Sequence, residues 1–217
     1  MNEMPQWLRP YLTPPTHEAI TRHVAAAERM TSGEIVPMVV RRSATFGHVP
    51  LVTIALLMNV LLILDMIALD FGFGLPAWLI TLAGVATIPL GLLLSRWSSW
   101  QRLMSHRGDL RTQVERRAQL EFHALKVAAT EQRTGILLFV SLAEHQAVVL
   151  ADLGIAAKLP AETWSQVLKA LTHGSKIGAM GRGFCEAIDQ CGTILADHFP
   201  APARNDNELR DALIIRD

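Results

Sequence analysis

Two acidic residues are placed where a divalent cation could bind. Asp152 directly follows an apolar segment with the pattern of a strand, and Glu162 stands near the start of the next helical pattern. Side chains at the carboxyl end of a strand often face a ligand in α/β folds, and carboxylate oxygens suit Ca²⁺ and Mg²⁺. The pair predicts a site for Ca²⁺ or Mg²⁺. Calcium takes six or more oxygens, so two carboxylates supply only part of a coordination shell. Roles in a turn and at a helix start explain both residues equally well.

The other reactive residue types lack the spacing that their chemistry needs. Eight histidines are scattered without a His-Glu-x-x-His pattern, and Cys185 and Cys191 lie six apart in an apparent helix. Neither arrangement indicates a zinc site or a disulfide. The run GAMGRGF at 178–184 follows a helical pattern rather than a strand. It therefore does not fit a dinucleotide-binding turn and predicts a loop between two helices.

Charge and composition exclude one class of partner and favour another. Twenty basic and twenty acidic side chains cancel, and the isoelectric point is about 7.1. Because phosphate backbones need a basic surplus on one face, we expect no nucleic-acid partner. Half of the residues are hydrophobic, only 18% are charged, and residues 43–64 and 71–95 carry no charge. Such an apolar excess is unusual for a soluble domain and predicts contact with a lipid bilayer.

The uncharged runs predict a transmembrane hairpin at residues 48–96. Its spans, about 49–69 and about 75–94, are each long enough to cross roughly 30 Å of hydrocarbon as a helix. Backbone polar groups in lipid must be satisfied internally, so both spans should be helical, and the short link between them makes the pair antiparallel. Asp65 lies in the first span about one turn from its far end. There its carboxylate can reach the headgroups, which is the simpler reason for a charge at this depth.

Basic residues orient the predicted hairpin. The link between the spans carries Asp70 and no basic residue. The basic residues lie before the first span and after the second: Arg29, Arg41, Arg42, Arg96, Arg102, Arg107, Arg111, Arg116 and Arg117. The positive-inside rule then places both termini in the cytoplasm. A buried soluble core is the alternative, which two uncharged runs of this length disfavour.

The segment before the hairpin, residues 1–47, carries only part of a fold. It predicts a helix capped by Thr16 and ended by Gly33, followed by a strand at 34–41. Pro37 in that strand has no amide hydrogen to donate, which indicates an edge position or a bulge. One helix and one strand bury too little apolar surface to offset the cost of ordering the backbone.

The segment after the hairpin, residues 97–217, carries the remaining elements. Its apolar spacing alternates between helical and strand-like patterns. The expected elements are an amphipathic helix within 99–131, a central strand at 136–142, its hairpin partner at 147–151, a helix opened by Pro160, a last helix stopped by Pro200, and an extended polar tail at 200–217 that is apolar only at 213–215.

Joining the two segments completes the fold. The stretches ERMTSGEIVPMVV at 28–40 and EQRTGILLFVSL at 131–142 each show a helix end, a turn with glycine and a strand. We predict that they are neighbours in one sheet. The fold class is therefore α/β, with a small mixed sheet flanked by helices. Residues 1–47 and 97–217 form this discontinuous cytoplasmic domain, and the hairpin interrupts it.

Three stretches carry a resemblance to a known family. ERMTSGEIVPMVV, RTGILLFVSLAEHQAVVLADLGIAAKLP and GFCEAIDQCGTILADHFP, in this order and spacing, resemble the TPM domain family. The ending NELRDALII at 207–215 is similar to the tail of its bacterial membrane-anchored branch. The match covers about residues 16–47 and 112–217. It implies a compact α/β fold with a small sheet between helices, tethered here to the bacterial inner membrane.

The resemblance also implies function. The best-known branch of the family acts in photosystem maintenance in the thylakoid lumen and has been associated with acid phosphatase activity, and some members bind divalent metal. Many members carry a Gly-Tyr-Gly-Leu-Glu-Gly…Leu-Pro-Asp pattern after the hairpin strand. This chain keeps Gly154, Leu159 and Pro160. It has Ala156 for the glutamate and Ala161 for the aspartate, so two carboxylates of that pattern are missing.

Two functions are therefore in competition. The first is a membrane-anchored TPM-like domain that acts without catalysis, as a binding, assembly or maintenance factor for a membrane protein or complex. The alternative is a phosphatase that hydrolyses phosphomonoesters with Ca²⁺ or Mg²⁺ held by Asp152 and Glu162. The thin carboxylate set and the missing pattern residues favour the first.

Overall fold

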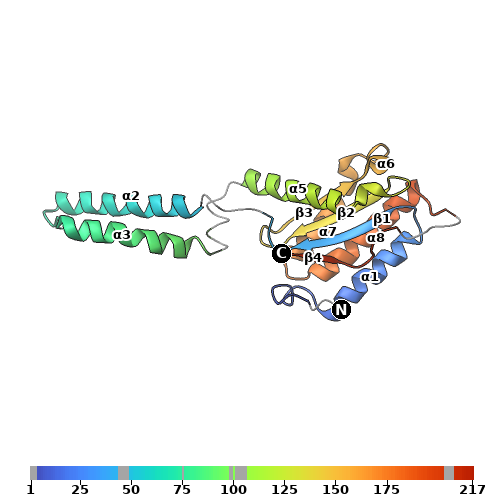
Figure 1. Cartoon of the computed structure of the whole chain (residues 1–217), viewed down its shortest axis with the longest axis horizontal. Coiled ribbons are helices and arrows are strands. Elements are labelled where there is room, and N and C mark those ends of the chain that lie inside the picture. The colour runs from blue at the N-terminus through green and yellow to red at the C-terminus, as the bar shows by residue number, and fades with distance from the viewer. Residues whose placement is uncertain (1–3, 44–48, 75, 98–99, 101–106, 203–207) are drawn as a thin grey trace. The chain divides into compact units, whose positions relative to one another are not determined.

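Four strands from both sides of the hairpin form one mixed sheet in the computed structural model (Figure 1). The structure describes residues 4–43, 49–74, 76–97, 100, 107–202 and 208–217. The chain forms two units, Met1–Ser43 with Arg111–Asp217, and Ala44–Leu110. The elements in chain order are α1 (Pro14–Glu28), β1 (Glu34–Val40), α2 (Val49–Asp70), α3 (Ala77–Leu94), α5 (Arg107–Ala124), η1 (Val127–Ala129), β2 (Gly135–Ser141), β3 (Gln146–Ala151), α6 (Leu153–Ala156), η2 (Ala161–Trp164), α7 (Ser165–Lys176), α8 (Met180–His198) and β4 (Ile214–Arg216).

The sheet has the strand order β3-β2-β1-β4. β1 and β2 run parallel, with Glu34 opposite Gly135, so the two glycine-turn units lie side by side as predicted. β2 and β3 form the predicted antiparallel hairpin, and β4 pairs parallel with β1. The sheet is therefore mixed. Of its two central strands, β1 precedes the α2–α3 hairpin in sequence and β2 follows it.

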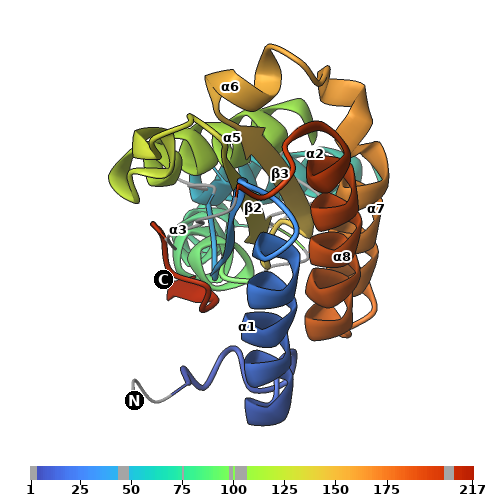
Figure 2. The same cartoon turned by 90° about the vertical axis from the view of Figure 1, so that its right-hand side faces the viewer.

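Helices cover both faces of this sheet (Figures 1 and 2). Ile35 and Val39 of β1 belong to the cluster that includes α1, α7 and α8, whereas Val36 and Met38 belong to the cluster that includes α5. Every residue of β1 and β2 is buried. A strand covered on both faces is apolar at consecutive positions rather than alternating, which is the pattern of ILLFVSL at 136–142.

The position of Pro37 differs from the prediction. β1 is a central strand, not an edge strand. β4, however, pairs with β1 only over Met38–Val40, so Pro37 lies one residue before that pairing begins. Among the described residues, the first half of β1 has β2 as its one strand neighbour. Proline lacks an amide hydrogen and is therefore tolerated where a strand has no neighbouring strand on one side. This condition holds for the first half of β1, whereas in an edge strand it holds for the whole length.

The bounds of α1 also differ from the prediction. The helix begins at Pro14, with Thr13 rather than Thr16 as its N-cap, because proline suits the first helical positions. It ends at Glu28, before Gly33. In the turn that follows, Thr31 Oγ1 donates to the carbonyl of Phe199 at 2.6 Å.

The glycine run at 178–184 is helix over most of its length, so the predicted loop is wrong. α8 begins at Met180, and only the turn at Gly178, with φ +73°, precedes it. A Cβ added at Gly183 would lie 2.8 Å from the carbonyl oxygen of Ala170, and one at Gly174 would lie 2.8 Å from the Cα of Gly183. These glycines let the backbones of α7 and α8 approach closely.

The tail predicted at 200–217 ends inside the sheet. Residues 203–207 lie outside the described residues, but Leu213 is buried and β4 follows it. Arg216 Nη1 lies 2.9 Å from Glu121 Oε2, and Trp7 Nε1 donates to Asp217 Oδ1 at 2.7 Å. The end of the tail is therefore a structural part of the domain rather than an extended polar appendage.

The second unit contains the two apolar helices. α2 and α3 are antiparallel neighbours (Figure 1), and each is long and apolar enough to cross a membrane, with mean hydropathies of 2.5 and 2.0. Gly91 packs so close to Ile54 that an added Cβ would lie 2.5 Å from Ile54 Cγ1. The absence of a side chain at Gly91 allows the two helices to approach this closely. Near the start of α2, the buried Thr53 Oγ1 accepts a hydrogen bond from Trp100 Nε1 at 2.8 Å.

Candidate functional site

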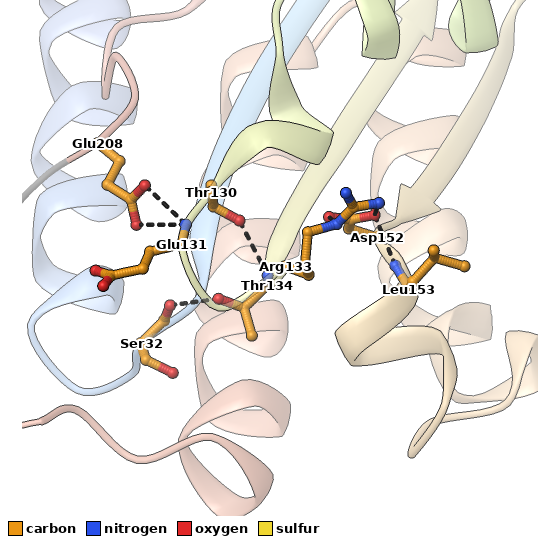
Figure 3. Close-up of polar contacts among 8 residues, drawn as sticks. All are labelled: Ser32, Thr130, Glu131, Arg133, Thr134, Asp152, Leu153 and Glu208. Atoms are coloured by element: carbon orange, nitrogen blue, oxygen red, sulfur yellow. Dashed lines mark hydrogen bonds and ion pairs between the residues drawn. The ribbon is translucent and has the colours of Figure 1, made fainter.

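Asp152, the first predicted metal ligand, is buried and forms an ion pair with the side chain of Arg133 (Figure 3). Arg133 Nε lies 2.7 Å from Asp152 Oδ2, and Arg133 Nη2 donates to Oδ1 at 3.1 Å. The guanidinium therefore makes one hydrogen bond and one close ion contact to the carboxylate, which neutralises its charge and orients it. Asp152 also caps α6, because its Oδ1 accepts from the Leu153 amide at 2.7 Å. Oδ1 is therefore hydrogen-bonded, whereas Oδ2 lies within ion-pair distance of Arg133 and has no hydrogen-bond partner among the described residues.

The turn at residues 130–134 brings Arg133 to this position. Arg133 has a left-handed backbone conformation, with φ 57°. The Thr134 amide donates to Thr130 Oγ1 at 3.1 Å, which closes the turn. The Gly154 amide donates to the Arg133 carbonyl at 3.1 Å, and a Cβ at Gly154 would lie 2.6 Å from that oxygen. Glycine at 154 is thus required by the close approach of α6 to the turn at 130–134, whether or not a ligand binds.

The same turn contacts the other segment of the domain. Thr134 Oγ1 donates to the Ser32 carbonyl at 2.7 Å, in the turn before β1. The Glu131 amide donates to the carboxylate of Glu208 at 3.0 and 3.3 Å. Figure 3 shows these contacts converging on the turn from the segment before the hairpin and from the tail. The predicted site region is therefore a junction between parts of the chain.

Glu162, the second predicted ligand, is exposed in η2, and the contacts of Asp152 are with Arg133 and Leu153. Within the described ranges, no group of three or more His, Cys, Asp or Glu side chains is arranged to hold a metal ion. A cation bound by Asp152 and Glu162 would compete with the Arg133 guanidinium for the same oxygens. The metal site stays a prediction, and this residue set fits a divalent ion poorly.

A pair of buried glutamates lies near the start of β1, and no pattern in the sequence predicted it. Glu28 Oε1 accepts from the Ile35 amide at 2.8 Å, and burial, helped by the nearby charges of Glu34 and Asp211, raises the pKa of Glu28 to about 8. Burial also raises the pKa of Glu34, whose carboxylate accepts from the amides of Glu208 and Leu209. These contacts hold the tail segment beside β1.

A chain of polar contacts lies at the opposite end of β1 and β2. Ser43 Oγ donates to Ser141 Oγ at 2.8 Å, and Ser141 Oγ donates to the Glu144 carboxylate. The Ser43 amide also donates to that carboxylate, at 3.3 Å. The carboxyl ends of parallel strands are a frequent ligand position. In this structure, however, the three side chains bind one another and tie the end of β1 to the turn between β2 and β3.

The outer surface of α2 and α3 is apolar and exposed along both helices. In the most apolar window of each helix, 6% and 17% of the residues are buried. Aromatic side chains are exposed at both ends of the pair: Phe71, Phe73 and Trp78 near the link, and Trp97 at the other end. Asp65 lies partly exposed in α2, and among the described residues its buried Oδ1 has no hydrogen-bond partner.

Comparison with known proteins reveals one similar structure and no assigned family. The protein-family models and the curated proteins that were compared do not match this chain. The NMR structure of the BA42 protein from the psychrophilic bacterium Bizionia argentinensis is similar, with a TM-score of 0.59 and 20% sequence identity. The match covers 94% of this chain and 95% of that one. At this identity the likeness concerns the fold alone, and it agrees with a mixed α/β architecture.

Proposed function

We propose that this chain is a TPM-like domain held at the bacterial inner membrane by its two-helix hairpin. There it acts without catalysis, as a binding, assembly or maintenance factor for a membrane protein complex. The observation that carries the proposal is the exposed apolar surface of α2 and α3. A contiguous exposed apolar surface along two whole helices marks contact with a membrane or with another protein.

The burial and the position of α2 and α3 fit neither a soluble core nor a signal sequence. A core helix of a soluble protein has most of its side chains buried, whereas 6% and 17% of the residues in the most apolar windows of these two are buried. A cleavable signal sequence lies at the N-terminus, whereas α2 begins at Val49, after α1 and β1. The aromatic residues at both ends of the hairpin suit the two membrane interfaces. Each observation supports two crossings.

The charge pattern supports a cytoplasmic domain. Arg41 and Arg42 lie before α2, and Arg96 follows α3, whereas the far end of the pair has Asp70 as the last residue of α2 and no basic residue in the link at 71–76. The positive-inside rule then places both termini in the cytoplasm. The domain would therefore be presented to cytoplasmic proteins or to the cytoplasmic face of a membrane complex.

The polar contacts of the domain favour binding over catalysis. Asp152 is paired with Arg133, and the hydroxyl of Ser141 donates to Glu144. A general base or a nucleophile must be able to reach a substrate atom, and these groups already bind neighbouring elements. The resemblance to the TPM family is consistent with a membrane-tethered domain of this kind.

Membrane attachment and orientation can be tested on the full chain in its own membranes. We expect the chain to stay in the membrane fraction after alkaline carbonate extraction. Protease added to inside-out vesicles should digest the residues after Trp100, and protease added to right-side-out vesicles should leave them intact. Release by carbonate would contradict the anchor, and the reverse protease pattern would contradict the orientation.

The binding role can be tested by recovery of partners from mild detergent extract. The full chain should recover a membrane protein or complex reproducibly. The matched control is the hairpin, residues 44–110, joined to an unrelated soluble domain, which should not recover it. Equal recovery by both proteins would assign binding to the hairpin rather than to the domain. No enrichment by the full chain over an empty-membrane control would contradict a binding function.

A further inference from the structure

The carboxamide side chain of Asn59 lies near the middle of α2, on the surface that does not pack against α3. Asn59 is ten residues from Val49 and eleven from Asp70, so in a membrane it would be near the centre of the hydrocarbon. Its side chain is exposed. Polar groups at that depth are costly unless they find partners, so they commonly mark a functional contact. This inference rests on the proposed insertion of the hairpin.

Asn59 is directed away from α3. Ile54 and Met58 contact Gly91 and Gly84 of α3, which defines the side of α2 that packs within the hairpin. At about 100° per residue, Asn59 is about 140° around the helix from Ile54. The packing of α2 on α3 therefore leaves the carboxamide on the outer surface, facing whatever surrounds the hairpin.

Asn59 belongs to a stripe of exposed side chains with regular spacing. We define the α2 stripe as Val52, Leu56, Asn59, Ile63 and Met66; the four apolar members are 44%, 44%, 54% and 69% exposed. Successive members are four, three, four and three residues apart. This is the spacing with which two helices pack along their length, and a single Asn in such a stripe specifies the register of the pair.

The hydrogen bonds of Asn59 are incomplete within its own helix. Nδ2 donates to the carbonyl of Ala55 at 2.9 Å. A carboxamide has two N–H donors and an oxygen with two acceptor positions, so one donor and the oxygen still require partners. No water is available at the centre of a bilayer. An Asn on a neighbouring helix at the same depth would supply both a donor and an acceptor.

We propose that the partner is a second copy of this chain, with the two α2 helices packed side by side along the α2 stripe. Identical chains insert in the same orientation, so the two Asn59 side chains meet at the same depth. A carboxamide is complementary to itself, because each one can donate to the oxygen of the other. The rest of the stripe is apolar and needs no charged partner. The hairpin is thus both the anchor and a dimer contact.

Disulfide cross-linking in native membranes tests the pairing. Cys185 and Cys191 are first replaced by serine and alanine, and a single cysteine is then introduced in the full chain. Leu56→Cys and Ile63→Cys on the stripe should form dimers when an oxidant is added. Leu64→Cys is the matched control, because Leu64 is 58% exposed but lies off the stripe. It should cross-link much less.

The role of Asn59 is tested in the Ile63→Cys background. Asn59→Leu should lower the cross-linked fraction, with a roughly threefold to thirtyfold weaker association, as expected for loss of an interhelical hydrogen bond in lipid. Asn59→Gln should retain most of it, because the carboxamide is kept. Equal cross-linking of Asn59→Leu and the parent would overturn the role of the carboxamide.

The remaining outcomes separate this inference from the proposed function. A chain that resists carbonate extraction but forms no dimer from either stripe position overturns the pairing and leaves the anchor intact. Cross-linking of Leu64→Cys as strong as that of Ile63→Cys overturns the assigned face. A stripe cysteine that links to a different protein overturns the second copy as occupant. A chain that carbonate releases overturns the membrane anchor itself.

Discussion

At the scale of single residues, the burial and the raised pKa values of two glutamates could not be predicted from any sequence pattern. Glu28 and Glu34 stand on either side of a turn, as acidic residues in surface loops commonly do. The fold buries both, and the backbone amides that they bind belong to β1 in one case and to the tail in the other. Their shifted pKa values therefore report on the assembly of the domain.

Glu28 makes the stability of the domain depend on pH. Its pKa is about 8 in the folded chain, above its ordinary value of 4.5. Between these values the folded form holds a proton that the unfolded form has lost, so the contribution of Glu28 to stability is greatest below pH 4.5 and is lost as pH rises toward 8. The slope from one such proton is at most about 1.4 kcal/mol per pH unit. Glu34 acts in the same direction.

Glu28→Gln should flatten this dependence and stabilise the chain most near pH 8, because an amide cannot ionise but keeps an acceptor for the Ile35 amide. Unfolding of the full chain in detergent, followed by tryptophan fluorescence at pH 5, 6.5 and 8, measures the effect. Glu162→Gln is the control, since Glu162 is exposed. An unchanged slope in Glu28→Gln would mean that Glu28 does not hold the extra proton.

Asp152 offers a test of the predicted metal site. Asp152→Ala removes the cap of α6 and the partner of Arg133, and it should destabilise the chain by about 1–2 kcal/mol. Asp152→Asn keeps a capping oxygen and should cost less. Because Arg133 already supplies the positive charge, millimolar Ca²⁺ or Mg²⁺ should not change the melting temperature of the parent chain. Stabilisation by calcium that disappears in Asp152→Ala and Glu162→Ala would instead establish the metal site.

At the scale of elements, the turn before each central strand decides how closely its neighbours pack. Gly33 precedes β1 and Gly135 begins β2. A Cβ at Gly135 would lie 2.1 Å from the carbonyl oxygen of Val127, which belongs to the backbone. A Cβ at Gly33 would meet Leu195 Cδ1 at 2.8 Å, which is the end of a flexible side chain. The same residue type thus has different requirements in the two turns.

Gly135→Ala should therefore cost about 3 kcal/mol, because η1 must move away from β2, whereas Gly33→Ala should cost about 1 kcal/mol. Chemical denaturation of the two variants beside the parent measures both values. Equal costs would indicate that the η1 backbone yields as easily as the Leu195 side chain does.

At the scale of the whole molecule, the sheet depends on residues from both sides of the hairpin. β1 lies between β2 and β4, so its removal would separate β4 from the sheet and expose one edge of β2. The residues of the α2–α3 hairpin that the structure describes, 49–74 and 76–97, take no part in the strand pairing. The domain should therefore require residues 1–43 but not residues 44–110.

Replacing residues 44–110 with a long Gly/Ser linker should give a soluble, folded domain. Deleting residues 1–43 in addition should give an unfolded or aggregated product. Circular dichroism and size-exclusion chromatography of the two proteins measure the difference. A folded product without residues 1–43 would show that the segment after the hairpin is sufficient, which would contradict the shared sheet.

The sequence by itself determined the properties that depend on neighbours in the chain. Runs of apolar residues located α2 and α3 within a few positions, and apolar spacing located β2, β3 and the amphipathic helix α5. The paired glycine turns even indicated that β1 and β2 are neighbours. These predictions succeeded because hydrophobicity and its period are local, and local periods decide whether a segment is helix or strand.

Tertiary structure alone decided which polar and small residues meet. It paired Arg133 with Asp152, buried Glu28, placed β4 in the sheet, and used Gly174 and Gly183 to join two helices rather than to make a loop. Whether a carboxylate is solvated, capped or paired depends on groups far away in sequence, and the period of a segment carries no information about them. Burial and electrostatic pairing exist only after the two halves of the domain have come together.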